Sequence, residues 1–232
     1  MTAPAIRYDN LSDIDLAARA AAREAGAIRT ITTRNNQRLF RAAWSVLRSH
    51  TDAEEAVQDA YLKAFNRMAD YSGKASLSTW LTRIVVNTAL DHKRAAERRR
   101  AALYDQDIAV IEDQRALHAA NSGAAQSPEA ELARAELGRA IMKAVARLPD
   151  DYRSVFVLRD IEGMSVRETA QAASLKEATV KTRLHRARHL LRDDLAVDIG
   201  GIIANTIPFA GADCEAMTQR VLSALTPAQT GD

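Results

Sequence analysis

The sequence predicts an all-α fold, and three observations support that prediction. No proline lies between Pro4 and Pro128, so long helices are permitted throughout that stretch. Apolar residues recur at helical spacing in several segments, and few β-branched runs alternate with period two. The chain has 232 residues, of which 47% are hydrophobic. This is enough for packed cores in one large domain or two small ones.

The first 30 residues are rich in alanine and predict an N-terminal helical extension, residues 1–30. We expect a helix at residues 13–24 that ends near Gly26. A second helix is expected at residues 33–48, where Leu39, Phe40, Ala43 and Trp44 recur at helical spacing. It opens the first of two predicted domains, residues 31–100.

The third predicted helix covers residues 52–68 and has one apolar and one polar face. Asp52 fits an N-cap, and Glu55 three residues later would complete a capping box. Val57, Tyr61 and Phe65 recur at helical spacing and predict a core face. The other face is acidic and polar, which by itself is the pattern of a solvated surface.

A loop is predicted at residues 70–78, where serines surround Gly73, which permits a positive φ. Ser78 would cap the helix that follows, and Leu81 and Val85 would lie on its core face. The opposite face carries Arg83, Asn87, Asp91 and Arg94. This helix runs into a basic block at residues 93–100.

Residues 101–127 lose helical periodicity and predict a flexible linker. A second helical domain is expected at residues 128–198, and Pro128 suits the first turn of its first helix. Within it, Ser165 and Glu168 have capping-box spacing, and a basic helix follows shortly afterwards. The outer face of that helix carries Glu177, Lys181, Thr182, Arg183, Arg186 and His189. A capped helix followed by a basic helix is typical of a DNA-binding helix-turn-helix.

The overall composition limits the function classes. The net charge is only +2, so a nucleic-acid partner does not follow from the total. One cysteine, Cys214, excludes an intramolecular disulfide and a cysteine-cluster metal site. There is no phosphate loop, no nucleophile signature and no third ligand for His185 and His189, so neither an enzyme nor a cofactor is expected. Without a secretory signal or a long apolar run, we expect a cytoplasmic protein that does not insert into membranes.

Two separate blocks carry specific motifs. Residues 38–94 contain D-A-E-E-A-V-Q-D and S-T-W-L-T-R-I-x-x-N-T-A-L-D, and residues 148–195 contain LP-x-x-YR-x-VF-x-L-x-D-x-EG. Together, and in this order, they resemble regions 2 and 4 of bacterial RNA polymerase sigma factors of the extracytoplasmic-function (ECF) group. The two blocks cover nearly half of the chain. The resemblance implies a subunit that gives core RNA polymerase its promoter specificity.

The resemblance also implies roles for individual residues. The helix at 52–68 would dock on the coiled coil of the polymerase β′ subunit through Asp52, Glu55, Gln58 and Asp59. The loop and the next helix would capture and melt the −10 promoter element through Tyr71, Ser72, Lys74, Ser76, Arg83, Asn87 and Arg94. The second domain, near the β flap, would read the −35 element through Lys181, Thr182, Arg183 and Arg186. Trp80 is expected in the core.

Several alternatives stay open. A free-standing helix-turn-helix regulator would explain the second block but leave the first without a role. Factors of this family are often held inactive by an anti-sigma partner, and the linker and the apolar extension at residues 199–232 suggest one here. That extension, which contains Cys214, is expected to form a short helix packed on a domain. The family turn usually reads Gly-Leu-Ser, whereas this chain has Ser174, Leu175 and Lys176. Ser174 and Glu177 could therefore form a capping box that starts the reading helix earlier.

Overall fold

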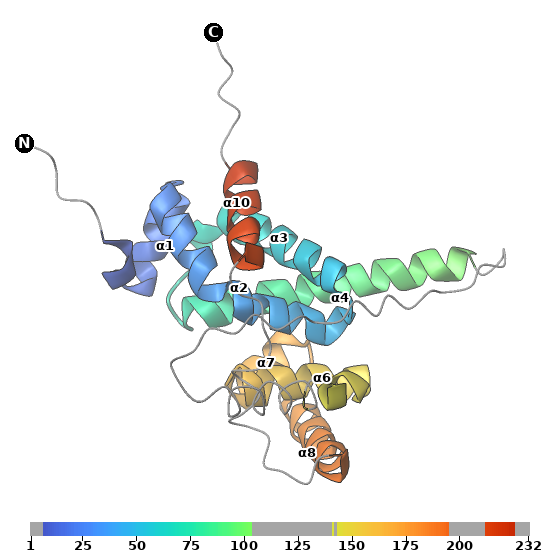
Figure 1. Cartoon of the computed structure of the whole chain (residues 1–232). Helices are drawn as coiled ribbons and strands as arrows, with labels where there is room; N and C mark the ends of the chain where they lie inside the picture. Colours follow the sequence, from blue (N-terminus) through green and yellow to red (C-terminus); the bar gives the residue numbers. More distant parts are fainter. Residues whose placement is uncertain (1–6, 104–140, 142, 195–211, 226–232) are drawn as a thin grey trace, which may run out of the picture.

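The computed structural model describes residues 7–103, 141, 143–194 and 212–225, and all regular structure within these ranges is helical. The helices form two bundles, which are blue to green and yellow to orange in Figure 1. The predicted all-α architecture of two helical units is confirmed. The predicted linker at 101–127 and the helix start at Pro128 lie outside the described residues, except for 101–103, which are helical. None of the described helices is long and apolar enough to span a bilayer.

The first bundle begins with a 3-10 turn, η1 (Tyr8–Asn10), and two helices, α1 (Asp13–Ala21) and α2 (Ala25–Leu47). The boundary expected near Gly26 is wrong, because the chain turns at Arg23, whose φ is 62°. Gly26 instead lies inside α2 against the ring of Tyr8, where a Cβ would come within 2.3 Å of the ring. The glycine provides room for a neighbouring side chain and does not end a helix.

The bundle is completed by α3 (His50–Asn66), the short turn η2 (Met68–Asp70) and α4 (Leu77–Leu103). The N-cap of α3 is Ser49 and not Asp52, because the Ser49 hydroxyl accepts a hydrogen bond of 3.2 Å from the Asp52 amide. The capping box predicted for Asp52 and Glu55 is therefore wrong. Asp52 lies in the first turn of α3, where its negative charge interacts favourably with the positive end of the helix dipole.

The start of α4 is also earlier than predicted. Ser76, and not Ser78, provides the capping hydroxyl, which accepts a hydrogen bond of 3.2 Å from the Thr79 amide. The carboxylate of Asp13 in α1 accepts a second bond, of 2.8 Å, from the Leu77 amide. Because α1 contributes this cap and packs on the other helices, residues 7–30 of the predicted extension are part of the first bundle.

The second bundle contains α6 (Asp150–Phe156), a π-helical turn η3 (Val157–Ile161), α7 (Val166–Ala172) and α8 (Glu177–Asp194). The predicted capping box of Ser165 and Glu168 is present at the start of α7. The alternative box of Ser174 and Glu177 is wrong, because Ser174 has a φ of 55° and forms the turn, and α8 begins only at Glu177. A serine here adopts the left-handed conformation that glycine adopts at lower cost.

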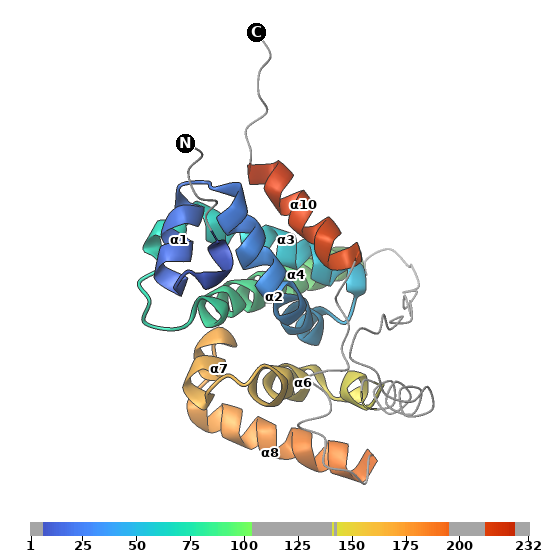
Figure 2. The same cartoon turned by 60° about the vertical axis from the view of Figure 1, so that its left-hand side comes forward.

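The two bundles pack against each other through α2 with α6 and through α4 with α7 (Figure 2). Glu162 is almost fully buried at this contact and pairs with Arg41, with 2.5 Å between Arg41 Nε and Glu162 Oε1. The guanidinium of Arg38 donates a bond of 2.7 Å to the backbone carbonyl of Glu162. Lys93 of α4 also pairs with Asp150 of α6. Polar contacts therefore join the bundles along with apolar packing.

The last described helix, α10 (Ala212–Leu225), follows the second bundle in sequence but packs on α2 and α3 of the first (Figures 1 and 2). Met217 and Val221 are fully buried in this contact. The apolar residues before position 212 lie outside the described residues. The expected short helix packed on a domain is present.

Candidate nucleic-acid interface

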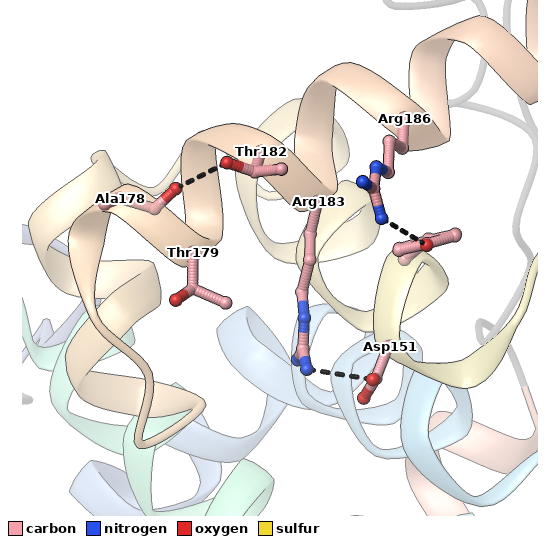
Figure 3. A pocket seen from close by; sticks show the side chains of 7 residues that line it. Asp151, Ala178, Thr179, Thr182, Arg183 and Arg186 are labelled. Atoms are coloured by element: carbon pink, nitrogen blue, oxygen red, sulfur yellow. Dashed lines mark hydrogen bonds and ion pairs between the residues drawn. The ribbon is translucent and has the colours of Figure 1, made fainter.

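The predicted −35 residues lie together on the outer face of α8. Lys181, Thr182 and Arg186 are exposed, and Arg183 is half-buried. The side chain of Thr182 is engaged locally, since its hydroxyl donates a bond of 3.0 Å to the carbonyl of Ala178. Figure 3 shows this face beside an open hollow of about 400 Å³, between α8 and the start of α6.

Two residues of α6 that had no assigned role hold the arginines of this face. Arg183 Nη2 lies 2.8 Å from Asp151 Oδ2, and Arg186 Nη1 lies 3.3 Å from the Tyr152 hydroxyl (Figure 3). Fixing a guanidinium before it meets a ligand reduces the entropy lost on binding. The LPDDYR motif contained both partners, but only the packing of α6 on α8 brings them to the arginines.

Arg188, which lies farther along α8, is held differently. Its guanidinium makes two hydrogen bonds to Asp160, of 2.8 and 2.7 Å. These bonds raise the pKa of the Arg188 side chain. The geometry is that of a bidentate pair, so this guanidinium is committed to the protein and not to the hollow.

The predicted −10 loop has a fixed and an exposed part. The Tyr71 hydroxyl donates a bond of 2.7 Å to the Ala75 carbonyl, and its ring centroid lies 5.7 Å from that of Trp80. Burial, together with the carboxylate of Asp13, raises the pKa of Tyr71. Ser72, Lys74 and Ser76 are all exposed, but the Ser76 hydroxyl is already engaged in capping α4. Ser72 and Lys74 are therefore better placed to meet a ligand than the half-buried Tyr71 or the capping Ser76.

The predicted −10 residues of α4 all lie on its solvent-exposed side. Arg83 and Asn87 are one turn apart, and both are exposed. Arg94 is exposed as well and lies 3.3 Å from Asp91 within the same helix. Trp80, which was expected in the core, packs against it but is only half-buried.

The predicted docking residues line α3. Asp52, Glu55 and Asp59 are exposed, and Gln58 is half-buried. Asp59 Oδ2 lies 3.0 Å from His92 Nε2 of α4. The face is acidic and accessible, which suits a basic partner surface.

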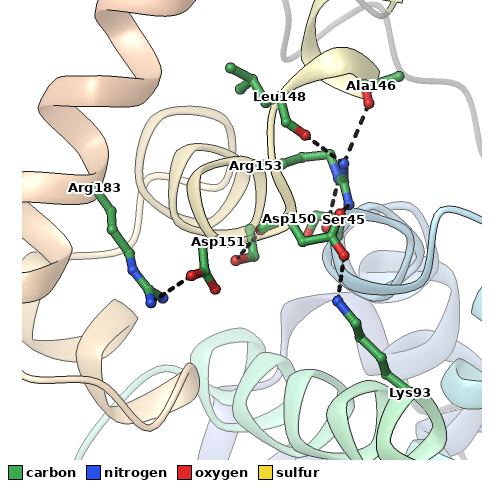
Figure 4. Close-up of polar contacts among 9 residues, drawn as sticks. Ser45, Lys93, Ala146, Leu148, Asp150, Asp151, Arg153 and Arg183 are labelled. Atoms are coloured by element: carbon green, nitrogen blue, oxygen red, sulfur yellow. Dashed lines mark hydrogen bonds and ion pairs between the residues drawn. The ribbon is translucent and has the colours of Figure 1, made fainter. Parts of the chain in front are cut away.

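The contact between the bundles contains one further cluster that the sequence did not reveal. The fully buried Arg153 donates to the carbonyls of Ser45 and Leu148, at 2.9 and 2.8 Å, and to the Asp150 carboxylate at 2.6 Å (Figure 4). Burial lowers the pKa of Arg153, and the bond to Asp150 opposes that effect. Arg153 belongs to the LPDDYR motif, whose arginine thus has a structural role.

Comparison with known proteins settles the family. Residues 31–99 match sigma-70 region 2, and residues 138–191 match sigma-70 region 4. Over 177 residues the chain is 32% identical to the ECF RNA polymerase sigma factor SigM of Mycobacterium tuberculosis, covering 76% of this chain and 81% of SigM. The chain belongs to the ECF sigma factors. Sigma factors are non-catalytic factors of transcription initiation.

Other relatives of this sigma factor support the same family assignment. The ECF sigma-E factor of Escherichia coli is 30% identical over 140 residues, 60% of this chain and 72% of that one. Among solved structures, RpoE bound to the anti-sigma factor NepR from Bartonella quintana matches with a TM-score of 0.55 and 26% identity, over 73% of this chain and 94% of RpoE. CnrH in complex with the cytosolic domain of CnrY matches with a TM-score of 0.50 and 27% identity, over 80% of this chain and 98% of CnrH.

Proposed function

We propose that this sigma factor docks on core RNA polymerase through α3, engages the −10 element through residues 71–76 and α4, and reads the −35 element through α8. The observation that carries the proposal is the opposite charge of its two exposed faces. The α3 face carries Asp52, Glu55 and Asp59, and the α8 face carries Lys181, Arg183 and Arg186. The acidic face suits a basic protein surface, and the basic face suits DNA.

In DNA, the residues of α8 would meet base edges of the major groove. Arg183 and Arg186 can each make a bidentate contact to guanine, which discriminates by about 1–3 kcal/mol against another base. Lys181 and Thr182 would contribute phosphate or weaker base contacts. The β flap of the polymerase would meet the second bundle. In this role the factor acts in the cytoplasm, where polymerase and DNA are.

On the −10 side, the exposed Ser72 and Lys74 would meet a base or phosphate of the melted strand, while Arg83, Asn87 and Arg94 support it from α4. The ring of Tyr71 already contacts that of Trp80, so a base would have to stack on the part of the Tyr71 ring that this contact leaves open. Ser72 and Lys74 would therefore make the first contact of the loop with the strand.

An anti-sigma partner is part of the proposal. RpoE and CnrH, two solved relatives, are bound to NepR and to the cytosolic domain of CnrY respectively. In this chain the two bundles are already packed together through Arg41 and Glu162. A protein that stabilised this packed arrangement would keep the two DNA-binding faces from reaching two promoter elements together. Purification of the tagged factor from unstressed and stressed cells of its host tests this, and recovery of polymerase alone under both conditions would contradict it.

Reconstituted transcription tests the main proposal. Core polymerase with the purified factor and fragmented host DNA should yield transcripts that share upstream motifs. The double variant Asp52→Lys/Glu55→Lys should lose core binding, and Arg183→Ala/Arg186→Ala should bind core polymerase normally but lose motif selectivity. Lys143→Ala, an exposed change outside both faces, serves as the control.

The alternative hypothesis, a stand-alone helix-turn-helix regulator, predicts DNA binding that does not need core polymerase. Tight, salt-sensitive binding to duplex DNA by the factor alone, without any binding to core polymerase, would favour that alternative. It would leave the acidic face of α3 without a role.

A further inference from the structure

Helix α10 lies outside both family matches, which end at residues 99 and 191. It follows α8 in sequence, yet it packs across α2 and α3 on the first bundle (Figures 1 and 2). The first bundle therefore carries a helix that neither sigma region accounts for. The contacts of that helix indicate what it does.

Specific polar contacts fix α10 in one position. Asn36 of α2 is fully buried and donates bonds of 2.8 Å to the Cys214 carbonyl and 3.0 Å to the Thr218 hydroxyl. These acceptors come from two successive turns of α10. A buried amide without acceptors is unfavourable, so Asn36 fixes both the register and the direction of the helix. Met217 and Val221 fill the apolar part of the same contact.

Helix α10 also forms an ion pair with an acidic side chain, Glu54, on one flank of the proposed docking face of α3. Arg220 Nη2 lies 3.4 Å from Glu54 Oε2, and Glu54 stands in sequence between Ala53 and the docking residue Glu55. Gln58, one turn beyond Glu54, lies on the same flank and is half-buried. A basic partner that approaches this flank meets a carboxylate that is already paired with a guanidinium.

We propose that α10 is a tethered competitor of core RNA polymerase for this flank of α3. The inference rests on the proposed docking role of α3. While α10 is seated, it occupies the side of α3 that carries Glu54 and Gln58, and Arg220 supplies the charge that the polymerase would supply. Full docking requires α10 to leave this surface. The apparent dissociation constant for core polymerase is therefore the intrinsic constant divided by the fraction of chains in which α10 is not seated.

Two full-length variants separate this effect from a simple change of charge. Met217→Asp/Val221→Asp places two carboxylates in the apolar contact and unseats α10. Ala216→Asp/Ser223→Asp adds the same charge on the exposed side of the same helix. The dissociation constant for core polymerase should fall about tenfold in the first variant, as expected if α10 is seated in nine chains of ten, and should stay unchanged in the second. Hydrogen exchange across 212–225 reports whether α10 has left.

A second pair of variants, with single substitutions, provides a test if Met217→Asp/Val221→Asp unfolds the first bundle. Arg220→Gln removes the pairing with Glu54 and keeps the apolar contact, and Ser223→Glu changes the net charge by the same amount. Tighter core binding by Arg220→Gln alone supports the inference. Equal or weaker binding by the folded unseated variants overturns it, because α10 would then be a neutral or supporting part of the surface. Absence of core binding by every form, wild type included, would instead reject the proposed function.

Discussion

Arg153 shows how one buried cation is accommodated at the contact between the two bundles. Its side chain is fully buried, and it satisfies carbonyls from α2 and from the residues before α6 (Figure 4). The half-exposed Asp150 balances its charge and also pairs with Lys93. Burial opposes ionisation of Asp150, but the bonds from Lys93 and Arg153 outweigh it and lower the pKa of that carboxyl.

Replacing this arginine should destabilise the protein. Arg153→Met keeps much of the volume but leaves the Ser45 and Leu148 carbonyls without a donor, which should cost at least about 2 kcal/mol of unfolding free energy. Urea unfolding followed by circular dichroism measures the loss. Arg167→Met, at an exposed position of α7, is the matched control and should change little. Equal losses in both variants would contradict a structural role for Arg153.

Asp151 should affect DNA selectivity more than DNA affinity. In Asp151→Asn the Arg183 guanidinium loses its 2.8 Å carboxylate contact and becomes less ordered, while a negative charge near the DNA disappears. Binding to unrelated duplex DNA should rise, and the ratio of specific to non-specific affinity should fall several-fold. Asp160→Asn, which releases Arg188, removes the same charge away from the hollow and should leave the ratio nearly unchanged. An unaltered ratio in Asp151→Asn would exclude the positioning role.

At the scale of elements, the sequence predicted the helices better than their ends. Apolar spacing located the core of α2, α3, α4 and α8, because burial of one face decides that a helix forms. The ends depend on which of several neighbouring capping residues is used. Ser49 precedes Asp52, and Ser76 precedes Ser78, and tertiary contacts such as the Asp13 carboxylate at Leu77 favour the earlier start. Pattern alone does not contain that information.

The candidate site was predictable to the same extent. Exposed faces of single helices follow from periodicity, so most of the predicted side chains of α8, α4 and α3 are exposed, although Gln58 and Arg183 are half-buried. Periodicity does not predict which side chains of other helices will pair with these residues. The contacts of Asp151 with Arg183, and of Arg220 with Glu54, join residues far apart in the chain and depend on packing angles.

The α7 capping box should give a measurable pH dependence. The Ser165 amide donates a bond of 2.8 Å to the Glu168 carboxylate and lowers the pKa of that group. A lowered folded-state pKa means that this stabilisation is complete above the unfolded pKa, near 4.5, and is lost as the pH falls through the folded-state pKa. The stability difference between wild type and Glu168→Gln should therefore shrink between pH 7 and pH 3. A difference that stays constant over that range would contradict the assignment.

At the scale of the whole molecule, the contact between the two bundles contains a buried ion pair. The side chains of Arg41 and Glu162 are 9% and 2% exposed, so neither charge is well solvated. Arg38 adds a bond to the same segment from a neighbouring turn of α2. Removing one member of such a pair is far more costly than replacing both, because the other charge stays buried.

Glu162→Gln should therefore separate the bundles. It leaves Arg41 without a countercharge at a cost of about 3–5 kcal/mol, which opening of the contact relieves by hydrating the arginine. Small-angle scattering should show a larger radius of gyration, and fluorophores on α4 and α8 should move apart. Glu177→Gln, on the exposed start of α8, is the control. Unchanged dimensions in Glu162→Gln would mean that the other contacts between the bundles hold them together without this ion pair.

The position of α10 has a consequence for the order in which the protein forms on the ribosome. Residues 7–103 emerge first and can assemble α1 to α4, but the surface that receives Met217 and Val221 stays uncovered until residues 212–225 have been synthesised. The second bundle must therefore emerge before the first is finished. A chain cut after α8 would keep the helices of both sigma regions, but it would open to water the surface that Met217 and Val221 cover, together with the amide of Asn36.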